Sequence, residues 1–185
     1  MEPILIDVPE VLETPRLILR APRSGDAIEM NRGVHDSFAE LHAWMNWAAE
    51  PPSLEATELF SRQSAASFLS RTALNYRIFV SADQVFAGCL SLFNIDWSIP
   101  KFEIGYWLRS SLCGNGLMTE AVIALAKMAK VKCDANRVEI RCDEKNIRSR
   151  RVAERAGFRL EGILANDSRD PAGNLRNTCV YAVVS

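Results

Sequence analysis

The chain lacks the segments that direct a protein to or through a membrane. Among its 185 residues no apolar run approaches the roughly 20 residues that span a bilayer, and the longest candidate, 121–131, is interrupted by Lys127 and Lys130. Residues 1–7 have neither the basic region nor the apolar stretch of a secretory signal. These absences predict a soluble protein of the cytoplasm.

Paired cysteines and a strong net charge are also absent. The five cysteines are an odd number, and no two of them have the spacing of a zinc-ligand pair. We therefore expect no metal, and free thiols in a reducing compartment, with only Cys113 a candidate for reactivity. The formal net charge of −1 gives no global indication of nucleic-acid binding.

No linker, repeat or low-complexity segment interrupts the chain, so a single domain is expected over 1–185, with its core at about 14–184. Strands are predicted at 16–20, 76–81, 86–93, 101–108, 137–142, 158–164 and 178–184. Helices are predicted at 26–41, 53–68, 118–129 and 147–156. The pattern is mixed α/β (α+β), with antiparallel hairpins early and a β–loop–α–β–α–β half late.

The most informative stretch reads as a strand, a short loop with Gly114 and Gly116, and the start of a helix. The glycines let the backbone turn and approach a ligand, and the free N–H groups of a helix N-terminus attract an anion. A Walker loop is excluded because Leu117 and Met118 follow the last glycine. A Rossmann loop is excluded because Thr119 stands where its third glycine belongs. The pattern therefore predicts a phosphate or pyrophosphate site for another cofactor, or else a loop that merely needs flexible residues.

Charge is unevenly distributed along the chain. Residues 24–60 contain seven acids and one base, whereas residues 127–159 contain eleven bases and five acids. Such runs have two alternative explanations. They are solvated helix faces, or they bind a polyanionic cofactor on the basic half and a cationic acceptor near the acidic half.

Four motifs in order resemble the GNAT acetyltransferases, in particular the RimJ/RimL type that acetylates the N-termini of ribosomal proteins. They are ETPRLILR at 13–20, EIGYWL at 103–108, GNGLMTEA at 114–121, and NIRS at 146–149 followed by AGF at 156–158 and EG at 161–162. The resemblance implies a GNAT fold with a mixed central sheet of about six or seven strands flanked by helices. One departure is Cys113, which stands where the family loop usually has Gln or Arg.

The resemblance also implies acetyl-CoA as cosubstrate and a set of residues that bind it. The pyrophosphate is expected at Gly114, Asn115, Gly116, Leu117, Met118 and Thr119. The pantetheine is expected along Tyr106, Trp107 and Leu108, and beside Asn146, which is equally suited to capping a helix.

Two residues are candidates for catalysis. Ser149 is similar to the family residue that protonates the coenzyme A thiolate, and it is also placed to cap a helix. Glu103 is the candidate base, because a carboxylate within an apolar strand is costly to bury unless it is paired; strand alternation could instead point it to solvent. Trp44 and Trp47 are candidate walls of an acceptor site, and Asp167 and Ser168 are weaker acceptor-side candidates.

The function expected from these features is direct transfer of acetyl from acetyl-CoA to a primary amine. The first acceptor candidate is a protein or peptide N-terminal α-amine, such as that of a ribosomal protein, with no nucleic-acid or membrane partner. Alternatives are a small-molecule amine acetyltransferase for polyamines or antibiotics, and a non-catalytic module that binds acyl-CoA. The sequence leaves a homodimer open.

Overall fold

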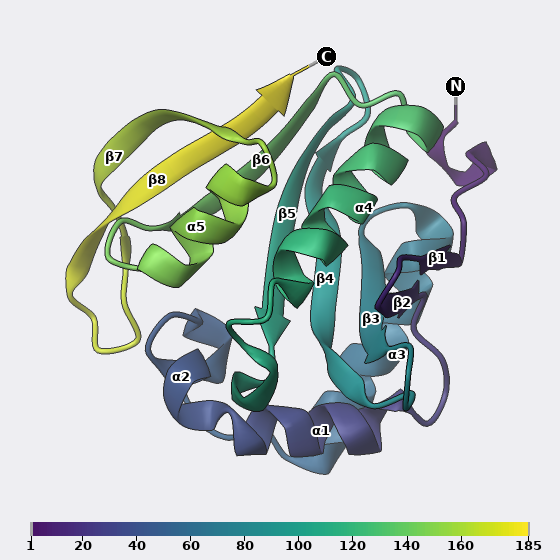
Figure 1. The fold of residues 1–185 in the computed structure, drawn as a ribbon, viewed down its shortest axis with the longest axis horizontal. Coiled ribbons are helices and arrows are strands. Elements are labelled where there is room, and N and C mark those ends of the chain that lie inside the picture. Colours follow the sequence, from purple (N-terminus) through teal and green to yellow (C-terminus); the bar gives the residue numbers. More distant parts are fainter. Residues whose placement is uncertain (1, 185) are drawn as a thin grey trace.

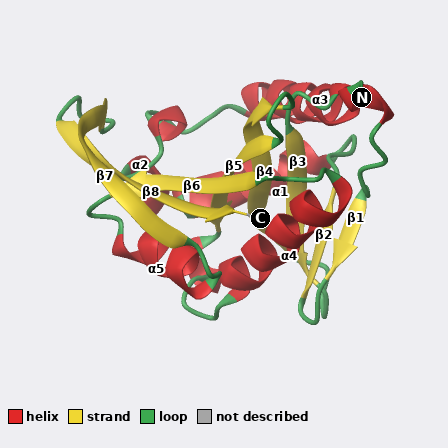
Figure 2. Cartoon of the chain, turned by 90° about the horizontal axis from the view of Figure 1, so that it is seen from above, coloured by secondary structure: helices red, strands yellow, loops and turns green. Residues whose placement is uncertain are grey.

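The computed structural model describes residues 2–184 and shows one twisted sheet with helices on both faces (Figures 1 and 2). The sheet has eight strands in the order β1-β2-β3-β4-β5-β6-β8-β7. All neighbouring strands are antiparallel except β5 and β6, which are parallel. The mixed α/β prediction with antiparallel strands early is therefore confirmed.

The elements follow one another along the chain as strands and helices interspersed with three short 3-10 turns. The strands are β1 (Val11–Glu13), β2 (Leu17–Arg20), β3 (Leu74–Val80), β4 (Phe86–Asp96), β5 (Lys101–Leu108), β6 (Arg137–Asp143), β7 (Arg159–Arg169) and β8 (Leu175–Val184). The helices are α1 (Asp26–Asp36), α2 (Phe38–His42), α3 (Leu54–Ser70), α4 (Leu117–Lys132) and α5 (Ile147–Arg155). The 3-10 turns are η1 (Pro3–Leu5), η2 (Asn46–Ala48) and η3 (Ser110–Leu112).

The two faces of the sheet have different neighbours. On β3, the side chains of Leu74, Tyr76 and Ile78 belong to the main apolar cluster, together with buried residues of α4 such as Val122 and Leu125. Successive strand residues point to opposite faces, so Asn75 and Arg77 lie on the other face. Figure 2 shows α3 on the side of the sheet away from α4 and α5.

The ends of several elements differ from the sequence-based expectation, β7 most of all, which runs to Arg169 instead of 164, and two differences are larger. The eighth strand is β1, whose three residues pair with β2 at the edge and are too few to show alternation. The helix predicted over 26–41 is interrupted at Ser37, whose buried hydroxyl accepts the Ser110 N–H at 3.0 Å and separates α1 from α2. The N-cap of α1 is Gly25, in a left-handed conformation, and Asp26 is the first residue of the helix.

The feature that positions the site is a separation between β5 and β6. These parallel strands pair only at Lys101–Arg137, Phe102–Val138 and Glu103–Glu139. Beyond Glu103, β5 continues to pair with β4 on one side through Leu108, but no strand within residues 2–184 pairs with it on the other. The remaining backbone groups of β5 on that side face a gap in the middle of the sheet.

Candidate active site

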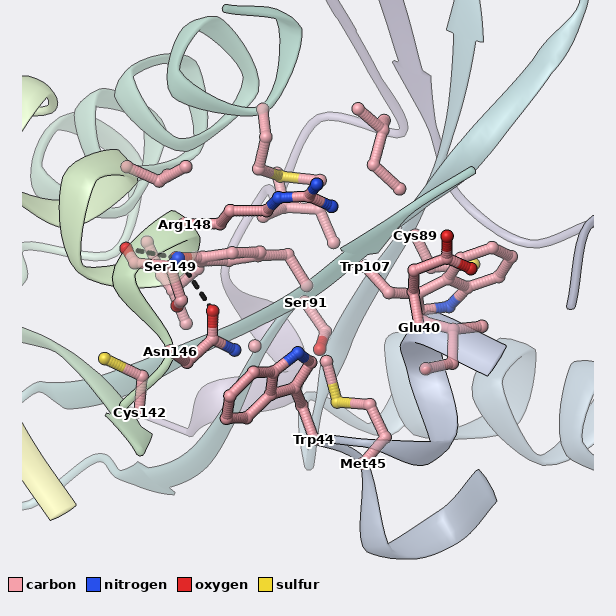
Figure 3. A pocket seen from close by; sticks show the side chains of 18 of the residues that line it. Glu40, Trp44, Met45, Cys89, Ser91, Trp107, Cys142, Asn146, Arg148 and Ser149 are labelled. Atoms are coloured by element: carbon pink, nitrogen blue, oxygen red, sulfur yellow. Dashed lines mark hydrogen bonds between the residues drawn. The ribbon is translucent and has the colours of Figure 1, made fainter. Parts of the chain in front are cut away.

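A cavity of about 1270 Å³ opens at the gap between β5 and β6. Its wall contains residues of all five helices, of the β5–α4 loop, and of strands β3, β4, β5, β6 and β8. Figure 3 shows Asn146, Arg148 and Ser149 coming from α5 on one side, and Trp44 and Met45 from the segment after α2 on the other. Nearly all of the residues predicted to form the site meet in this one space.

The loop before α4 has the conformation that an anion site needs. Gly114 and Gly116 have φ values of 89° and 76°, a region that side chains disfavour. The first N–H groups of this 16-residue helix have no intrahelical partners, and its N-cap, Gly116, offers no side chain to accept from them. Gly116, Leu117, Met118 and Thr119 line the cavity with Gly114, whereas Asn115 does not.

Side chains from the first motif hold this loop in place. Arg16 donates from Nη1 to the carbonyl of Asn115 at 2.9 Å and from Nε to Glu120 Oε2 at 2.7 Å. The hydroxyl of Thr14 donates to Glu120 Oε1 at 2.6 Å. Burial alone would raise the pKa of Glu120, but these hydrogen bonds lower the pKa below its usual value. The ETPR motif therefore connects β2 to the N-terminus of α4.

Cys113 is less reactive than its place in the loop suggests. Its thiol is half-buried and donates to the carbonyl of Arg109 at 3.5 Å. Burial raises the pKa of Cys113, although the nearby charge of Arg148 acts in the opposite direction. Arg148, on α5, also lines the cavity. It places near the loop a positive charge, which an arginine at position 113 would otherwise supply.

The β5 side chains divide between the two faces of the sheet. Tyr106 points toward α5, where its hydroxyl lies 2.8 Å from Ser149 Oγ and donates to the Ser149 carbonyl at 3.2 Å. Trp107 packs on the opposite face against Phe86 and Trp47, with ring centroids 5.8 and 6.4 Å apart. Leu108 ends the strand and packs against the main cluster. All three β5 residues line the cavity.

The start of α5 separates the roles of Asn146 and Ser149. Asn146 is the N-cap, because its side-chain oxygen accepts the Ser149 N–H at 3.1 Å. The Ser149 hydroxyl does not cap the helix and instead meets the hydroxyl of Tyr106. Burial raises the pKa of Tyr106, so this phenol stays protonated at neutral pH. The Ser149 hydroxyl thus sits in the cavity wall beside a second proton-bearing group.

Glu103 lies where β5 and β6 separate. Its carboxylate is half-buried and accepts a hydrogen bond from Asn94 Nδ2 at 2.9 Å. Burial raises the pKa of Glu103, and the hydrogen bond from Asn94 only partly offsets that effect. By strand alternation Glu103 faces the side opposite Tyr106. Because Ser149 contacts Tyr106, the two catalytic candidates, Glu103 and Ser149, lie on different faces of the gap.

The remaining acceptor-side candidates divide into two groups. Trp44 and Trp47 line the cavity as the sequence suggested, together with Glu40 and Ser91, which sequence reasoning missed. Asp167 and Ser168 lie outside it on β7, where Asp167 pairs with Arg141 and Ser168 accepts from Arg176. Glu40 and Ser91 have no local sequence signal, because only the packing of α2 and β4 brings them to this wall.

Residues 16–159 match the acetyltransferase (GNAT) domain. The chain belongs to the GNAT family. It is 37% identical over 134 residues to the probable N-acetyltransferase YjcK of Bacillus subtilis (strain 168), covering 72% of this chain and 71% of that protein. It is 31% identical over 124 residues to the ribosomal-protein-serine acetyltransferase of Escherichia coli (strain K12), covering 67% and 68%.

Solved structures extend the similarity over the whole fold. RimL, ribosomal L7/L12 alpha-N-protein acetyltransferase in complex with coenzyme A, is 27% identical with a TM-score of 0.89, covering 95% of this chain and 98% of that one. The microcin C7 self immunity acetyltransferase MccE in complex with acetyl-CoA and AMP is 26% identical with a TM-score of 0.87, covering 93% and 94%. This GNAT protein is an N-acetyltransferase that uses acetyl-CoA.

Residues 2–184 contain neither a membrane-spanning helix nor a metal-binding cluster. No helix in that range is long and apolar enough to cross a membrane. No group of three or more His, Cys, Asp or Glu side chains in the same range is arranged to hold a metal ion.

Proposed function

We propose that this single GNAT domain acetylates the N-terminal α-amine of a peptide or protein, by direct attack on acetyl-CoA. The observation that carries the proposal is the placement of Glu103 and Ser149 on opposite faces of the β5–β6 gap. A base on one face and a proton donor on the other suit an amine and a thioester that meet in the gap. Similarity to two ribosomal-protein acetyltransferases supports a protein acceptor.

The residues that bind the cosubstrate follow from the shape of the gap. The N–H groups of 117–119 at the start of α4 hold the pyrophosphate, and Arg148 adds a cation beside it. The unpaired edge of β5 at Tyr106, Trp107 and Leu108 binds the pantetheine amides as a neighbouring strand would. Bound acetyl-CoA supplies the thioester carbonyl that is attacked and the thiolate that leaves.

Glu103 and Ser149 then move protons at opposite ends of the reaction. Glu103 accepts a proton from the acceptor amine, directly or through water. An α-amine has a reference pKa of about 7.7–8.0, so a modest base suffices, whereas a lysine side chain near 10.4 demands more. Ser149 donates the proton that the leaving thiolate needs, and the hydroxyl of Tyr106 keeps that serine oriented.

Thiol release from acetyl-CoA, measured against a panel of acceptors, tests the proposal. The panel holds N-terminal peptides, the same peptides blocked at the α-amine but carrying a lysine, polyamines and aminoglycosides. We expect release with free α-amine peptides and none with blocked ones. Release only with polyamines or aminoglycosides would favour a small-molecule acetyltransferase, and binding of acetyl-CoA without release for any amine would favour a non-catalytic module.

A further inference from the structure

One guanidinium group in the cavity wall carries a charge that the described residues neutralise only in part. The side chain of Arg77 on β3 is 1% exposed. Its Nε and Nη2 have no hydrogen-bond partner, and its Nη1 donates only to the sulfur of Cys89, at 3.6 Å. Sulfur is a weak acceptor, so most of the donors of this buried arginine are unused.

The carboxylate that approaches Arg77 is already engaged. Asp26 Oδ2 lies 4.0 Å from Arg77 Nε, too far for a hydrogen bond. Arg20 holds both oxygens of Asp26, at 3.0 and 2.6 Å, and the N–H of Arg23 adds a third bond at 2.7 Å. Two guanidinium groups therefore share one carboxylate. Because buried charges in proteins are normally paired, the excess positive charge calls for an anion from outside the chain.

The position of Arg77 excludes the phosphates of coenzyme A as that anion. Leu74, Tyr76 and Ile78 point from β3 into the cluster with α4, so Arg77 lies on the opposite face, with the sheet between it and the pyrophosphate loop. On that face Arg77 lines the cavity together with Thr57 and Phe60 of α3. The Phe60 ring centroid is 5.6 Å from the guanidinium carbon.

Strand pairing gives the distance from the backbone of Arg77 to β5, the strand at the gap. Arg77 is opposite Cys89 on β4, and Cys89 is opposite Trp107 on β5. Two strand spacings separate Arg77 from β5, roughly 10 Å. An extended peptide advances about 3.3 Å per residue, so this distance corresponds to the first three residues of an acceptor whose amine lies at the gap.

We infer that Arg77 binds a carboxylate of the acceptor, and that the preferred acceptor is a peptide with an aspartate or glutamate at its second or third residue. The inference rests on the proposed function, since it assumes a peptide amine at the gap. It disfavours polyamines and aminoglycosides, which bring further positive charge to a cation whose nearest carboxylate is already shared with Arg20. It also agrees with the ion pairs of the acid-rich residues 24–60. Four acids there each pair with an arginine: Asp26, Glu29, Asp36 and Glu58. Paired acids attract a cationic acceptor less than isolated acids would.

Peptide binding to the protein saturated with coenzyme A, measured by calorimetry, tests the inference without requiring turnover. Two pairs of peptides are compared, with aspartate or asparagine at the second position and at the third. We expect the aspartate peptide of at least one pair to bind tenfold or more tightly than its asparagine match. Arg77→Gln and Arg77→Met should each remove the preference, and Arg62→Gln, which removes an exposed arginine of α3, should keep it.

The possible results separate the inference from the proposed function. Equal affinities within both pairs would overturn the role of Arg77, and so would a preference that survives Arg77→Gln and Arg77→Met. If thiol release still occurs with these peptides, the proposed function stands without the carboxylate site. If no peptide is bound or acetylated, the proposed function fails and the peptide acceptor inferred here fails with it. Arg77→Met should fold about as stably as the wild type, because Asp26 keeps its hydrogen bonds to Arg20 and Arg23 and the buried guanidinium is replaced by an apolar side chain.

Discussion

At the scale of single residues, the structure gives different tasks to two neighbours that the sequence left ambiguous. Asn146 accepts the Ser149 N–H, while the Ser149 hydroxyl contacts Tyr106. Capping of α5 and proton donation can therefore be tested with separate substitutions. A change at Asn146 should act mainly on stability, and a change at Ser149 mainly on rate.

Ser149→Ala should lower kcat by about 10²–10⁴-fold if its hydroxyl protonates the leaving thiolate. The Kd for acetyl-CoA should change less than threefold, because the cap of α5 and the pyrophosphate loop remain. Asn146→Ala is the matched control and should lower the free energy of unfolding by about 1 kcal/mol. Steady-state kinetics and thermal unfolding measure both effects. Full activity in a correctly folded Ser149→Ala protein would assign the proton donor to another group.

Glu103 should leave a signature in the pH dependence of kcat/KM. Both the α-amine and Glu103 must be deprotonated for base catalysis, and burial raises the pKa of Glu103 above that of an exposed glutamate. A plot of log kcat/KM against pH should therefore rise with a slope of about two below both pKa values and about one between them. Glu103→Gln should lower the rate and give a slope of about one at every pH below the pKa of the amine, with a plateau above it.

The same raised pKa predicts how Glu103 affects stability. Because burial favours the protonated carboxyl, folding is helped at low pH and the contribution is lost as the pH rises through the folded pKa. Glu103→Gln should therefore not lower the Tm at neutral pH. If Glu103→Gln kept the wild-type dependence of kcat/KM on pH, Glu103 would not be the base.

At the scale of elements, the loop between β5 and α4 depends on backbone conformation more than on side chains. Gly116 has a φ of 76°, and Gly157, which follows the last helix turn of α5, has a φ of 86°. A β-branched residue is strained at both positions, but only Gly116 lines the cavity. The two glycines form a matched pair for mutation.

Gly116→Val should weaken binding of acetyl-CoA at least tenfold, because strain displaces the loop and the side chain occupies space beside the helix N-terminus. Both variants should lower the free energy of unfolding by about 1–3 kcal/mol, but Gly157→Val should leave the affinity for acetyl-CoA unchanged. Calorimetric titration separates the two variants. Equal affinity in Gly116→Val and the wild type would place the pyrophosphate elsewhere.

What the sequence could predict depends on how local each feature is. The turn at Gly114 and Gly116 and the start of α3 depend on adjacent residues: the glycines have positive φ, and Ser53 accepts the Ala56 N–H at 3.1 Å. The break at Ser37 depends on Ser110, which lies 73 residues away in the chain. Arg77 gave no signal either, because one arginine in a strand does not reveal that its nearest carboxylate is shared. Long-range contacts of this kind require the fold.

At the scale of the whole molecule, binding of acetyl-CoA should stabilise the fold. A ligand at 100 times its Kd adds about 2.7 kcal/mol. For a domain of this length that corresponds to a rise in Tm of about 5–10 °C. Differential scanning fluorimetry measures the shift, with pantetheine as a control that lacks the diphosphate and should give a smaller one. No shift with saturating acetyl-CoA would contradict the cosubstrate site.

The gap between β5 and β6 has a consequence for hydrogen exchange. Beyond Glu103, the backbone amides of β5 that point away from β4 have no strand to bond to, although they lie in the middle of the sheet. Their protons should exchange with deuterated solvent much faster than those directed at β4, which is unusual for a central strand. Within β5, coenzyme A should slow exchange most at these alternate positions, so that mass spectrometry or NMR would detect its pantetheine arm as the missing neighbour of the strand.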